Sequence, residues 1–324
     1  MTVSYDVLGM GNAIVDVLAS TDDEFLRLNK LAKGAMSLID AERAEALYQA
    51  MRGAVECSGG SCGNTMAGIA SLGGKAAYIG KVRDDGLGWT FRHDIRAAGV
   101  AFDTPAATSG PPTARSLIFV TPDAQRTMNT YLGACVTLSP ADVDPALVAS
   151  AAVTYVEGYL WDAPDAKAAV VKAMDAAHAA GRQVSLTLSD SFCVDRWRDE
   201  FLDLVRNKVD ILFANEGELL SLYQAKSFDD ALQAARRDGQ VLALTRSAKG
   251  SVVVRGEEVH VVDAAPVKKV VDTTGAGDLY AAGFLYGFTR GLPLAECARI
   301  GGIAAAEIIS HVGARPEKPL KTLI

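Results

Sequence analysis

The sequence predicts an α/β protein with a doubly wound, mainly parallel sheet and a small β-rich part. After Pro140, short apolar runs alternate with segments of helical pattern. Parallel strands need crossover connections of this kind, so the alternation predicts a parallel sheet covered by helices. Between about residues 101 and 133 the pattern changes, because strand-like runs there are bounded by Pro, Gly and Asp and no helical pattern appears.

The expected elements follow from these patterns in chain order. The apolar runs that predict strands of the main sheet are Tyr5–Gly11, Ala76–Gly80, Val153–Glu157, Gln183–Leu188, Asp210–Ala214 and Val241–Thr245. Hairpins are expected at Ser116–Thr121 with Thr127–Leu132, and at Ser251–Val254 with Val259–Val262. The expected helices are Ala41–Met51, Cys62–Leu72, Gly86–Ala98, Ala163–Ala180, Trp197–Asn207, Phe228–Asp238, Ala276–Arg290 and Leu294–Ser310.

One domain over residues 1–324 accommodates all of these elements. The β-rich part combines three separate pieces, at about 12–20, 33–39 and 101–132. Because these pieces are discontinuous, we expect them to form a lid inserted on the α/β core. A lid over a site favours chemistry from which water must be excluded.

Composition narrows the class of protein. The 324 residues are 49% hydrophobic and 22% charged, with a formal net charge of -7. The acidic balance argues against a non-specific nucleic-acid or anionic-membrane surface. The start of the chain has no signal-peptide pattern and no apolar run is long enough to span a membrane. The five scattered cysteines indicate reduced thiols, so we expect a cytoplasmic protein. The sequence leaves open whether it is a monomer or a homodimer.

The segment from Asp272 to Asp278 reads D-T-T-G-A-G-D and leads directly into an expected helix. Free N–H groups and the helix dipole favour an anion at such a helix start, and Gly275 and Gly277 leave the backbone bare. Asp278 beside this pocket would accept the proton of an attacking hydroxyl, which is the chemistry of phosphoryl transfer. The alternative is a glycine-rich turn with Asp278 as an ordinary acid at a helix start.

Other motifs of phosphate, metal and hydrolase sites are missing from the sequence. No G-x-x-x-x-G-K-[ST] loop, no G-x-G-x-x-G after the first strand, no H-E-x-x-H and no G-x-S-x-G is present. The four histidines are isolated from one another. These absences exclude a Walker-type phosphate loop, a zinc site of the H-E-x-x-H type and a hydrolase of the G-x-S-x-G type.

The D-T-T-G-A-G-D segment resembles the C-terminal signature of the ribokinase (PfkB) family of sugar and nucleoside kinases. An N-terminal signature is similar to that of the same family. Its parts are G-G-S-C-G-N-T at 59–65, A-S-L-G-G at 70–74, I-G-K-V at 79–82 and D-D-G-L-G at 84–88. Asn215-Glu216-Gly217-Glu218 is similar to the N-x-x-E element of the family. The resemblance runs over nearly the whole chain, with its motifs in the family's order.

The resemblance implies roles for the reacting groups. Asp278 would be the catalytic base, and the N–H groups of Gly275, Ala276 and Gly277 would form the anion hole. The cofactors would be ATP and Mg²⁺, with Asn215 and Glu218 holding the metal mainly through water. Without the resemblance, Glu218 is interpreted as an acid in the first turn of a helix.

The resemblance also implies an ATP site and a cation site. Thr245, Arg246 and Gly250 would contact ATP, although the family has glycine where Ser247 stands. A plain surface charge is an equal alternative for Arg246. Asp272 and Thr274 would lie next to a bound monovalent cation such as K⁺.

The acceptor site follows from the same resemblance, most closely to the adenosine kinase branch. Asp16 would accept hydrogen bonds from ribose hydroxyls, Gly60 and Asn64 would complete the sugar site, and Asn12 would contact ribose. Arg126 would contact substrate or phosphate. Candidate walls for a base, each equally a candidate for the core, are Met36, Leu38, Leu132, Tyr159 and Trp161.

The sequence therefore predicts phosphoryl transfer from ATP to the primary hydroxyl of a ribose-containing small molecule, with adenosine converted to AMP as the first choice. A kinase of a free sugar, such as ribose, fructose or 2-keto-3-deoxygluconate, is the second choice. A non-catalytic nucleoside or sugar sensor is the third, and the presence of Asp278 with both glycines disfavours it.

Overall fold

The computed structural model describes residues 2–123 and 125–324. In these residues, nine strands form one sheet in the order β14-β13-β12-β11-β10-β9-β1-β5-β6. Its strands are β1 (Tyr5–Met10), β5 (Ala76–Ile79), β6 (Val100–Ala101), β9 (Ala151–Glu157), β10 (Gln183–Thr187), β11 (Ile211–Asn215), β12 (Val241–Thr245), β13 (Ser251–Arg255) and β14 (Glu258–Val262). The pairs from β6 to β12 are parallel, and β13 and β14 add an antiparallel hairpin. The predicted doubly wound, mainly parallel sheet is confirmed.

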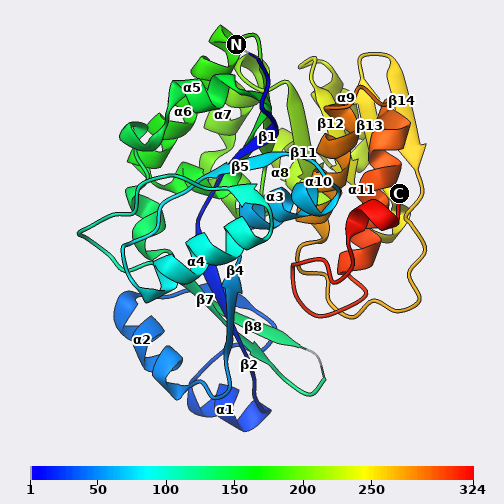
Figure 1. The fold of residues 1–324 in the computed structure, drawn as a ribbon. Coiled ribbons are helices and arrows are strands. Elements are labelled where there is room, and N and C mark those ends of the chain that lie inside the picture. Colours follow the sequence, from blue (N-terminus) through cyan, green and yellow to red (C-terminus); the bar gives the residue numbers. More distant parts are fainter. Residues whose placement is uncertain (1, 124) are drawn as a thin grey trace.

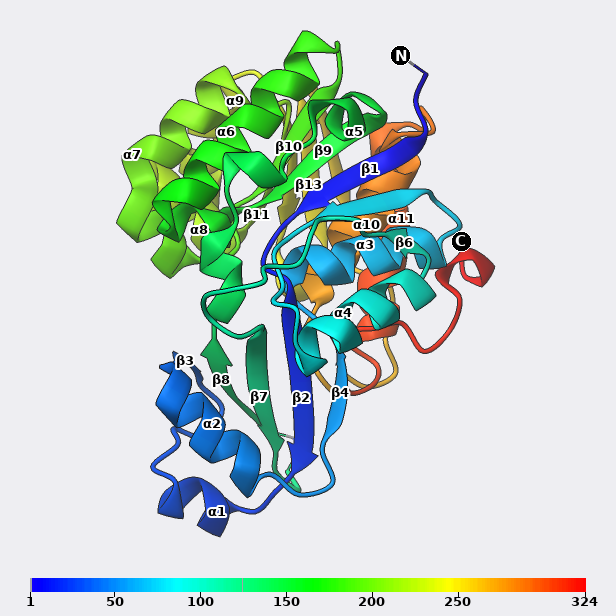
Figure 2. The same ribbon diagram turned by 60° about the vertical axis from the view of Figure 1, so that its left-hand side comes forward.

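Helices cover both faces of this sheet (Figure 1). Helices α3, α4, α10 and α11 lie on one side and α5 to α9 on the other, as the turned view in Figure 2 shows. Their bounds are α3 (Ser61–Ser71), α4 (Gly86–Ala97), α5 (Pro145–Ala149), α6 (Pro164–Ala179), α7 (Ser191–Asn207), α8 (Glu216–Tyr223), α9 (Phe228–Arg236), α10 (Ala276–Phe288) and α11 (Leu294–Ile308). Short 3-10 helices are η1 (Gly133–Thr137), η2 (Pro140–Asp142), η3 (Gly158–Asp162), η4 (Ser247–Lys249) and η5 (Leu320–Thr322).

Most strands of the large sheet are buried on both faces because helices cover each face, whereas the edge strand β14 is largely exposed. Val7 belongs to the hydrophobic cluster under α3, α10 and α11, whereas its neighbour Leu8 belongs to the cluster under α6 and α7. Successive side chains of a strand point to opposite faces, so a strand with two covered faces reads as a continuous apolar run. This is why the strand positions after Pro140 could be predicted from short apolar runs.

A second, five-stranded sheet lies below the large one in Figure 1, with the order β3-β8-β7-β2-β4 among the described residues. Its strands are β2 (Ile14–Ser20), β3 (Met36–Leu38), β4 (Val55–Ser58), β7 (Ala114–Val120) and β8 (Arg126–Tyr131). Helices α1 (Asp23–Leu28) and α2 (Ala41–Ala50) lie against it. Phe25 of α1 packs against Phe119 of β7, with ring centroids 5.0 Å apart and the ring planes tilted by 38°. We call this unit the small sheet.

The small sheet differs from the predicted β-rich part in two places. β4 was not predicted, and it pairs with β2. Ala101, where the third predicted piece begins, pairs with β5 in the large sheet instead. That piece, at about 101–132, also contains Ala124, which lies outside the described residues.

The predicted start of the helix Trp197–Asn207 is wrong. Helix α7 begins at Ser191, where Asp190 accepts a hydrogen bond from the backbone N–H of Cys193 as an N-cap, and it bends at Trp197, whose φ of -124° is not helical. In the described part of the chain, no helix is long and apolar enough to cross a membrane.

Candidate active site

The carboxyl ends of the parallel strands bring several predicted site residues, together with Glu157, to one edge of the large sheet. Glu157, Asn215 and Thr245 are the last residues of β9, β11 and β12. Asn12 follows β1 by two residues. In open α/β sheets this edge is where ligands bind.

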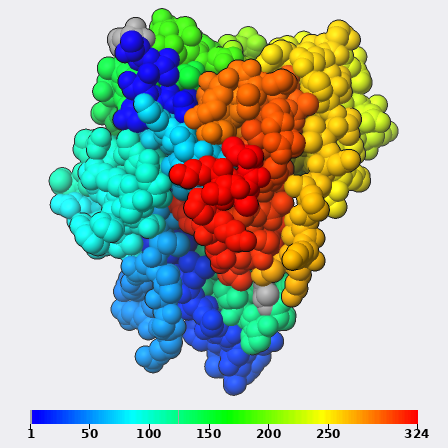
Figure 3. Space-filling view, turned by 45° about the vertical axis from the view of Figure 1, so that its right-hand side comes forward, coloured from blue at the N-terminus to red at the C-terminus, as the bar shows by residue number. Residues whose placement is uncertain are grey.

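Two cavities open near this edge. The first has a volume of about 700 Å³, is lined in part by the first residues of α10, and is called here the α10 cavity. The second has a volume of about 970 Å³, lies between β2, α3 and residues 312–321, and is called here the C-terminal cavity. Figure 3 shows the C-terminal segment, in red, on this side of the molecule.

Asp278 connects residues of the two cavities. Its Oδ1 accepts a hydrogen bond from Ser61 Oγ at 2.6 Å, and its Oδ2 accepts one from Asn64 Nδ2 at 2.9 Å. Asp278 and Ser61 line the α10 cavity, whereas Asn64 lines the C-terminal cavity. Burial raises the pKa of Asp278, while the hydrogen bonds from Ser61 and Asn64 and the charge of Arg315 lower it.

The glycine segment before Asp278 has the expected backbone form. Gly275 is the N-cap of α10 with a φ of +79°, a left-handed conformation that glycine adopts without strain. An added Cβ at Gly277 would meet nothing within 4 Å, so the backbone there is open. Gly275, Ala276 and Gly277 all line the α10 cavity, where free N–H groups at a helix start favour an anion.

Asn215 and Glu218 form a capping box at the start of α8. Asn215 Oδ1 accepts from the N–H of Glu218 at 2.9 Å, and Glu218 Oε2 accepts from the N–H of Asn215 at 2.9 Å. Both residues line the α10 cavity. Burial raises the pKa of Glu218 to about 7, which the hydrogen bond from Asn215 opposes.

These two residues fit a magnesium ion that keeps most of its water. Mg²⁺ in phosphate-transfer sites is usually held by one or two carboxylates, waters and substrate phosphates, rather than by a cage of protein ligands. Within the described ranges, no group of three or more His, Cys, Asp or Glu side chains could hold a metal ion. Glu218 lines the α10 cavity together with Asp263 and Asp278, so its carboxylate would hold such an ion through water.

The predicted ATP contacts divide into two groups. Thr245 and Gly250 line the α10 cavity, and Ser247, where the family has glycine, takes a φ of +52°. Arg246 is not in the lining. Its Nε donates to Glu216 Oε2 at 3.1 Å, and its guanidinium lies 3.9 Å from the centroid of the Phe228 ring.

The predicted acceptor residues gather around β2 and the start of α3. Asp16, Asn64 and Arg126 line the C-terminal cavity. Gly60 has a φ of +79°, and an added Cβ there would lie 2.4 Å from the carbonyl oxygen of Asn12. Burial raises the pKa of Asp16 to about 6, although Arg315 and Arg126 lower it.

Asn12 contacts a residue that the sequence analysis did not identify, Glu157. Asn12 Nδ2 donates to Glu157 Oε1 at 2.9 Å, and the N–H of Cys62 donates to Oε2 at 3.0 Å. Burial raises the pKa of Glu157 to about 7. The only signal in the sequence is that Glu157 is a single charged residue ending the apolar run Val153–Val156.

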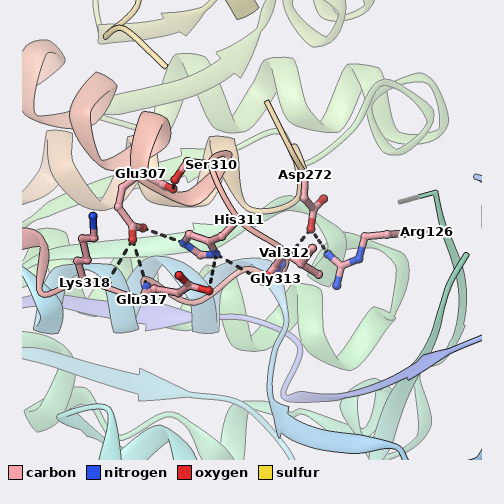
Figure 4. Close-up of polar contacts among 9 residues, drawn as sticks. All are labelled: Arg126, Asp272, Glu307, Ser310, His311, Val312, Gly313, Glu317 and Lys318. Atoms are coloured by element: carbon pink, nitrogen blue, oxygen red, sulfur yellow. Dashed lines mark hydrogen bonds and ion pairs between the residues drawn. The ribbon is translucent and has the colours of Figure 1, made fainter. Parts of the chain in front are cut away.

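Asp272 and Thr274 lie beside each other, outside the lining of either cavity. Asp272 Oδ1 accepts from the N–H and the Oγ1 of Thr274, at 3.0 and 2.7 Å. Its Oδ2 accepts from Arg126 Nη1 at 2.5 Å and from the N–H of Gly313 at 3.0 Å, and the close-up in Figure 4 shows both contacts. These four hydrogen bonds leave the carboxylate little capacity for a cation, so K⁺ binding there stays a prediction.

The candidate walls for a base are not all at the site. Trp161 packs against Phe201 with ring centroids 6.0 Å apart and donates its indole N–H to Glu200, so it belongs to the core on the far side of the sheet. Met36 and Leu38 are exposed on β3. Tyr159 is partly buried, and its N–H donates to Ser189 Oγ at 3.3 Å.

Comparison with known proteins agrees with this geometry. Residues 34–321 match the pfkB family carbohydrate kinase model. The adenosine kinase from Sinorhizobium meliloti is 58% identical, with a TM-score of 0.91 over 98% of both chains. A probable sugar kinase protein from Rhizobium etli CFN 42 is 55% identical, with a TM-score of 0.92 over 100% of this chain and 98% of that one. The adenosine kinase of Saccharomyces cerevisiae is 28% identical over 94% of each chain.

The matched region contains both signatures and nearly all of the residues around the two cavities. Since the family model covers most of the chain, the chain belongs to the PfkB family of carbohydrate kinases and is an ATP-dependent kinase of a sugar or nucleoside.

Proposed function

We propose that this kinase transfers the γ-phosphoryl group of ATP to the primary hydroxyl of adenosine, giving ADP and AMP. The observation that carries the proposal is the position of Asp278, whose two carboxylate oxygens bond to one residue from each cavity. A base in this position reaches an acceptor bound on one side and a phosphoryl group bound on the other.

In the proposed reaction, the acceptor hydroxyl loses its proton to Asp278 as its oxygen attacks the γ-phosphorus, and ADP leaves. The backbone N–H groups of Gly275, Ala276 and Gly277 stabilise the charge on the transferred group. Desolvation at a partly buried site strengthens both effects, and the hydrogen bonds from Ser61 and Asn64 orient the carboxylate before the acceptor arrives.

We place ATP in the α10 cavity. Its volume of about 700 Å³ is within the usual range for small-molecule sites. Thr245 and Gly250 contact the nucleotide, and Asn215 and Glu218 hold Mg²⁺ through water. The metal, when bound, neutralises phosphate charge. Arg246 serves the same region only if its ion pair with Glu216 opens.

We place the acceptor against the small sheet. Asp16 lies opposite Ser116 of β7 and Cys57 of β4 in the strand register, and Ser116 lies opposite Thr130 of β8. Residues in register share a face, so this face also carries Leu18, Ile118, Met128, Met36 and Leu38. Apolar side chains beside the carboxylate that binds ribose favour a nucleoside, because a free sugar has no flat apolar group to cover.

The small sheet would act as the lid. The face that carries Asp16 is turned toward the C-terminal cavity, and the opposite face packs on Phe25 and Leu47 of α1 and α2. Closure over the acceptor would exclude water from Asp278 and suppress hydrolysis of ATP.

The second candidate is a kinase of a free sugar. Its support is the similarity to the Rhizobium etli protein, which is described as a probable sugar kinase and is 55% identical to this chain. The reaction and its base would be the same, and only the group that covers the apolar face would differ.

An ADP-release assay with ATP and Mg²⁺ tests the proposal against this alternative. The acceptors are adenosine, inosine, ribose, fructose and 2-keto-3-deoxygluconate, and the Asp278→Asn variant serves as a control for background ATP hydrolysis. We expect turnover with adenosine at the lowest concentration among these acceptors. Turnover with a free sugar and none with adenosine would overturn the nucleoside assignment and keep the kinase.

A further inference from the structure

The loop after α11, residues 310–318, is attached to the protein at two points (Figure 4). At one end, Glu307 Oε1 accepts from the N–H groups of Glu317 and Lys318 at 3.1 and 3.2 Å, and Oε2 lies 3.2 Å from His311 Nε2. At the other, the N–H of Gly313 donates to Asp272. The loop therefore has a defined course, and Arg315 lies between its attachments.

Arg315 extends from this loop to the turn between β4 and α3. Its Nε and Nη2 donate to the carbonyl oxygen of Ser58 at 3.1 and 2.7 Å, and Nη2 also donates to Ser58 Oγ at 2.8 Å. Its Nη1 donates to the carbonyl oxygen of Gly63 at 2.7 Å. One planar guanidinium thus holds both ends of the turn formed by residues 58–63, and the rigid fork of arginine suits such a bridge.

This turn carries groups of the proposed reaction. Ser61 donates to Asp278, and Asn64, one residue beyond Gly63, donates to the other oxygen of the same carboxylate. An added Cβ at Gly59 would lie 2.3 Å from Cγ of Asp16. The turn therefore lies against both carboxylates.

None of these contacts pairs the positive charge of Arg315 with a negative charge. Its acceptors are two carbonyl oxygens and a hydroxyl, not carboxylates. Arg315 is partly buried, and burial lowers its pKa, although arginine remains protonated in proteins. Three carboxylates, Asp16, Asp94 and Asp278, lie close enough to favour its charged form. Asp94 also accepts from the N–H and Oγ of Ser58, at 2.7 and 2.6 Å.

We propose that Arg315 is a positioning residue for phosphoryl transfer, which holds the turn of residues 58–63 in place and supplies a positive charge beside the carboxylates of Asp16 and Asp278. The inference rests on the proposed roles of these two aspartates, and not on the identity of the acceptor. Asp278 interacts with Ser61, Asn64 and Arg315, and with the titratable groups of Asp16, Glu157, Cys62 and Tyr155. Asp16 interacts with Arg315, Arg126, Asp278 and Cys57.

Two variants separate the contacts of Arg315 from its charge. Arg315→Gln removes the charge, and Arg315→Lys keeps it while losing the fork that spans Ser58 and Gly63. Arg299→Gln is the control for loss of a positive charge, because Arg299 lies on α11 with a side chain 48% exposed and pairs only within its helix, with Glu296, among the described residues. Each variant is compared with the wild type for thermal unfolding, ATP binding and pH dependence of kcat/KM, with an acceptor that the wild type phosphorylates.

We expect Arg315→Gln to lower kcat by about 30-fold or more, as removal of a preorganised group does. Its ATP affinity stays unchanged, and the acidic limb of its kcat/KM profile moves up by about one pH unit because the aspartates lose a neighbouring cation. For Arg315→Lys we expect the acidic limb of the kcat/KM profile to stay where it is in the wild type. Its kcat should be lower than that of the wild type, but higher than that of Arg315→Gln. Arg299→Gln resembles the wild type in every measurement.

Two results would overturn the inference. One is an Arg315→Gln variant with the kcat and the acidic limb of the wild type. The other is an equal loss of kcat in both Arg315 variants with an unmoved limb, which would leave only a structural role. Failure of the wild type to use adenosine would instead contradict the proposed substrate, and Arg315 would then be tested with the sugar that the enzyme accepts.

Discussion

Arg126 of the small sheet forms an ion pair with Asp272 of the segment before α10, with 2.5 Å between Nη1 and Oδ2. The two side chains are only 8% and 6% exposed. Asp272 also bonds to Thr274 and to Gly313, so one carboxylate joins the small sheet, the anion segment and the C-terminal loop. This contact connects the proposed lid to the proposed site of phosphoryl transfer.

The Asp272→Asn variant should be less stable than the wild type by about 3 kcal/mol, because it leaves the charge of Arg126 buried without a partner. The double variant Arg126→Met with Asp272→Asn should recover part of this loss. Denaturant unfolding of the wild type, both single variants and the double variant measures the coupling energy. Strict additivity of the two single changes would show that the ion pair contributes nothing.

Asp16→Ala should mainly weaken acceptor binding. A carboxylate that accepts hydrogen bonds from ribose hydroxyls contributes about 1.5–3 kcal/mol, so the KM for the acceptor should rise about 10- to 100-fold. The KM for ATP should stay constant, since Asp16 lines the other cavity. Ser20→Ala, at the exposed end of the same strand, is the matched control. An unchanged acceptor KM would remove Asp16 from the site.

Gly277→Ala should reduce kcat without reducing stability. The added methyl group meets no protein atom within 4 Å, and alanine is the better helix former, but the methyl group projects where the anion would bind. We expect a loss of about 10- to 100-fold in kcat. Gly86→Ala also has open space at the start of a helix, α4, and should keep the activity of the wild type. Equal activity of the two variants would argue against an anion hole at Gly277.

Stability should fall as pH rises from about 5 to about 8. Burial raises the pKa of Asp16 to about 6 and those of Glu157 and Glu218 to about 7. In this range the native state therefore binds more protons than the unfolded state, and the free energy of unfolding decreases with increasing pH.

The Glu157→Gln variant measures how much Glu157 contributes to this pH dependence of stability. Its free energy of unfolding should decrease less with pH than that of the wild type, by about 2 kcal/mol over the range. Glu257→Gln, with a side chain 99% exposed in the wild type, should follow the wild type. Parallel curves for Glu157→Gln and the wild type would show that Glu157 has no raised pKa.

The sequence predicted the centre of the large sheet because the strands there are buried on both faces. Their apolar runs located β10, β11 and β12 within one residue, and β9 within two. β4 was missed because its four residues include one that is exposed and two that are half-buried, so no run marks it. α1 is only six residues long and has a single buried side chain, Leu26, which is too short for a helical period to appear.

The site was predictable where its residues are contiguous in the sequence. The segment 272–278 and the turn at 59–64 each carry several functional groups within a few residues, so their composition is informative. Arg315 could not be identified, because its partners Ser58 and Gly63 lie more than 250 residues away. Its neighbours in the sequence are typical of a surface loop, and only the fold brings it to the turn.

Asp278 is proposed to remove the proton from the acceptor hydroxyl. The most direct test is the Asp278→Asn variant, measured for turnover and, by calorimetry, for binding of ATP and of the acceptor. We expect turnover to fall by about 1,000-fold or more while both ligands still bind, because asparagine keeps the shape of the side chain and cannot take the proton. A variant that retains most of the kcat of the wild type would contradict this role of Asp278.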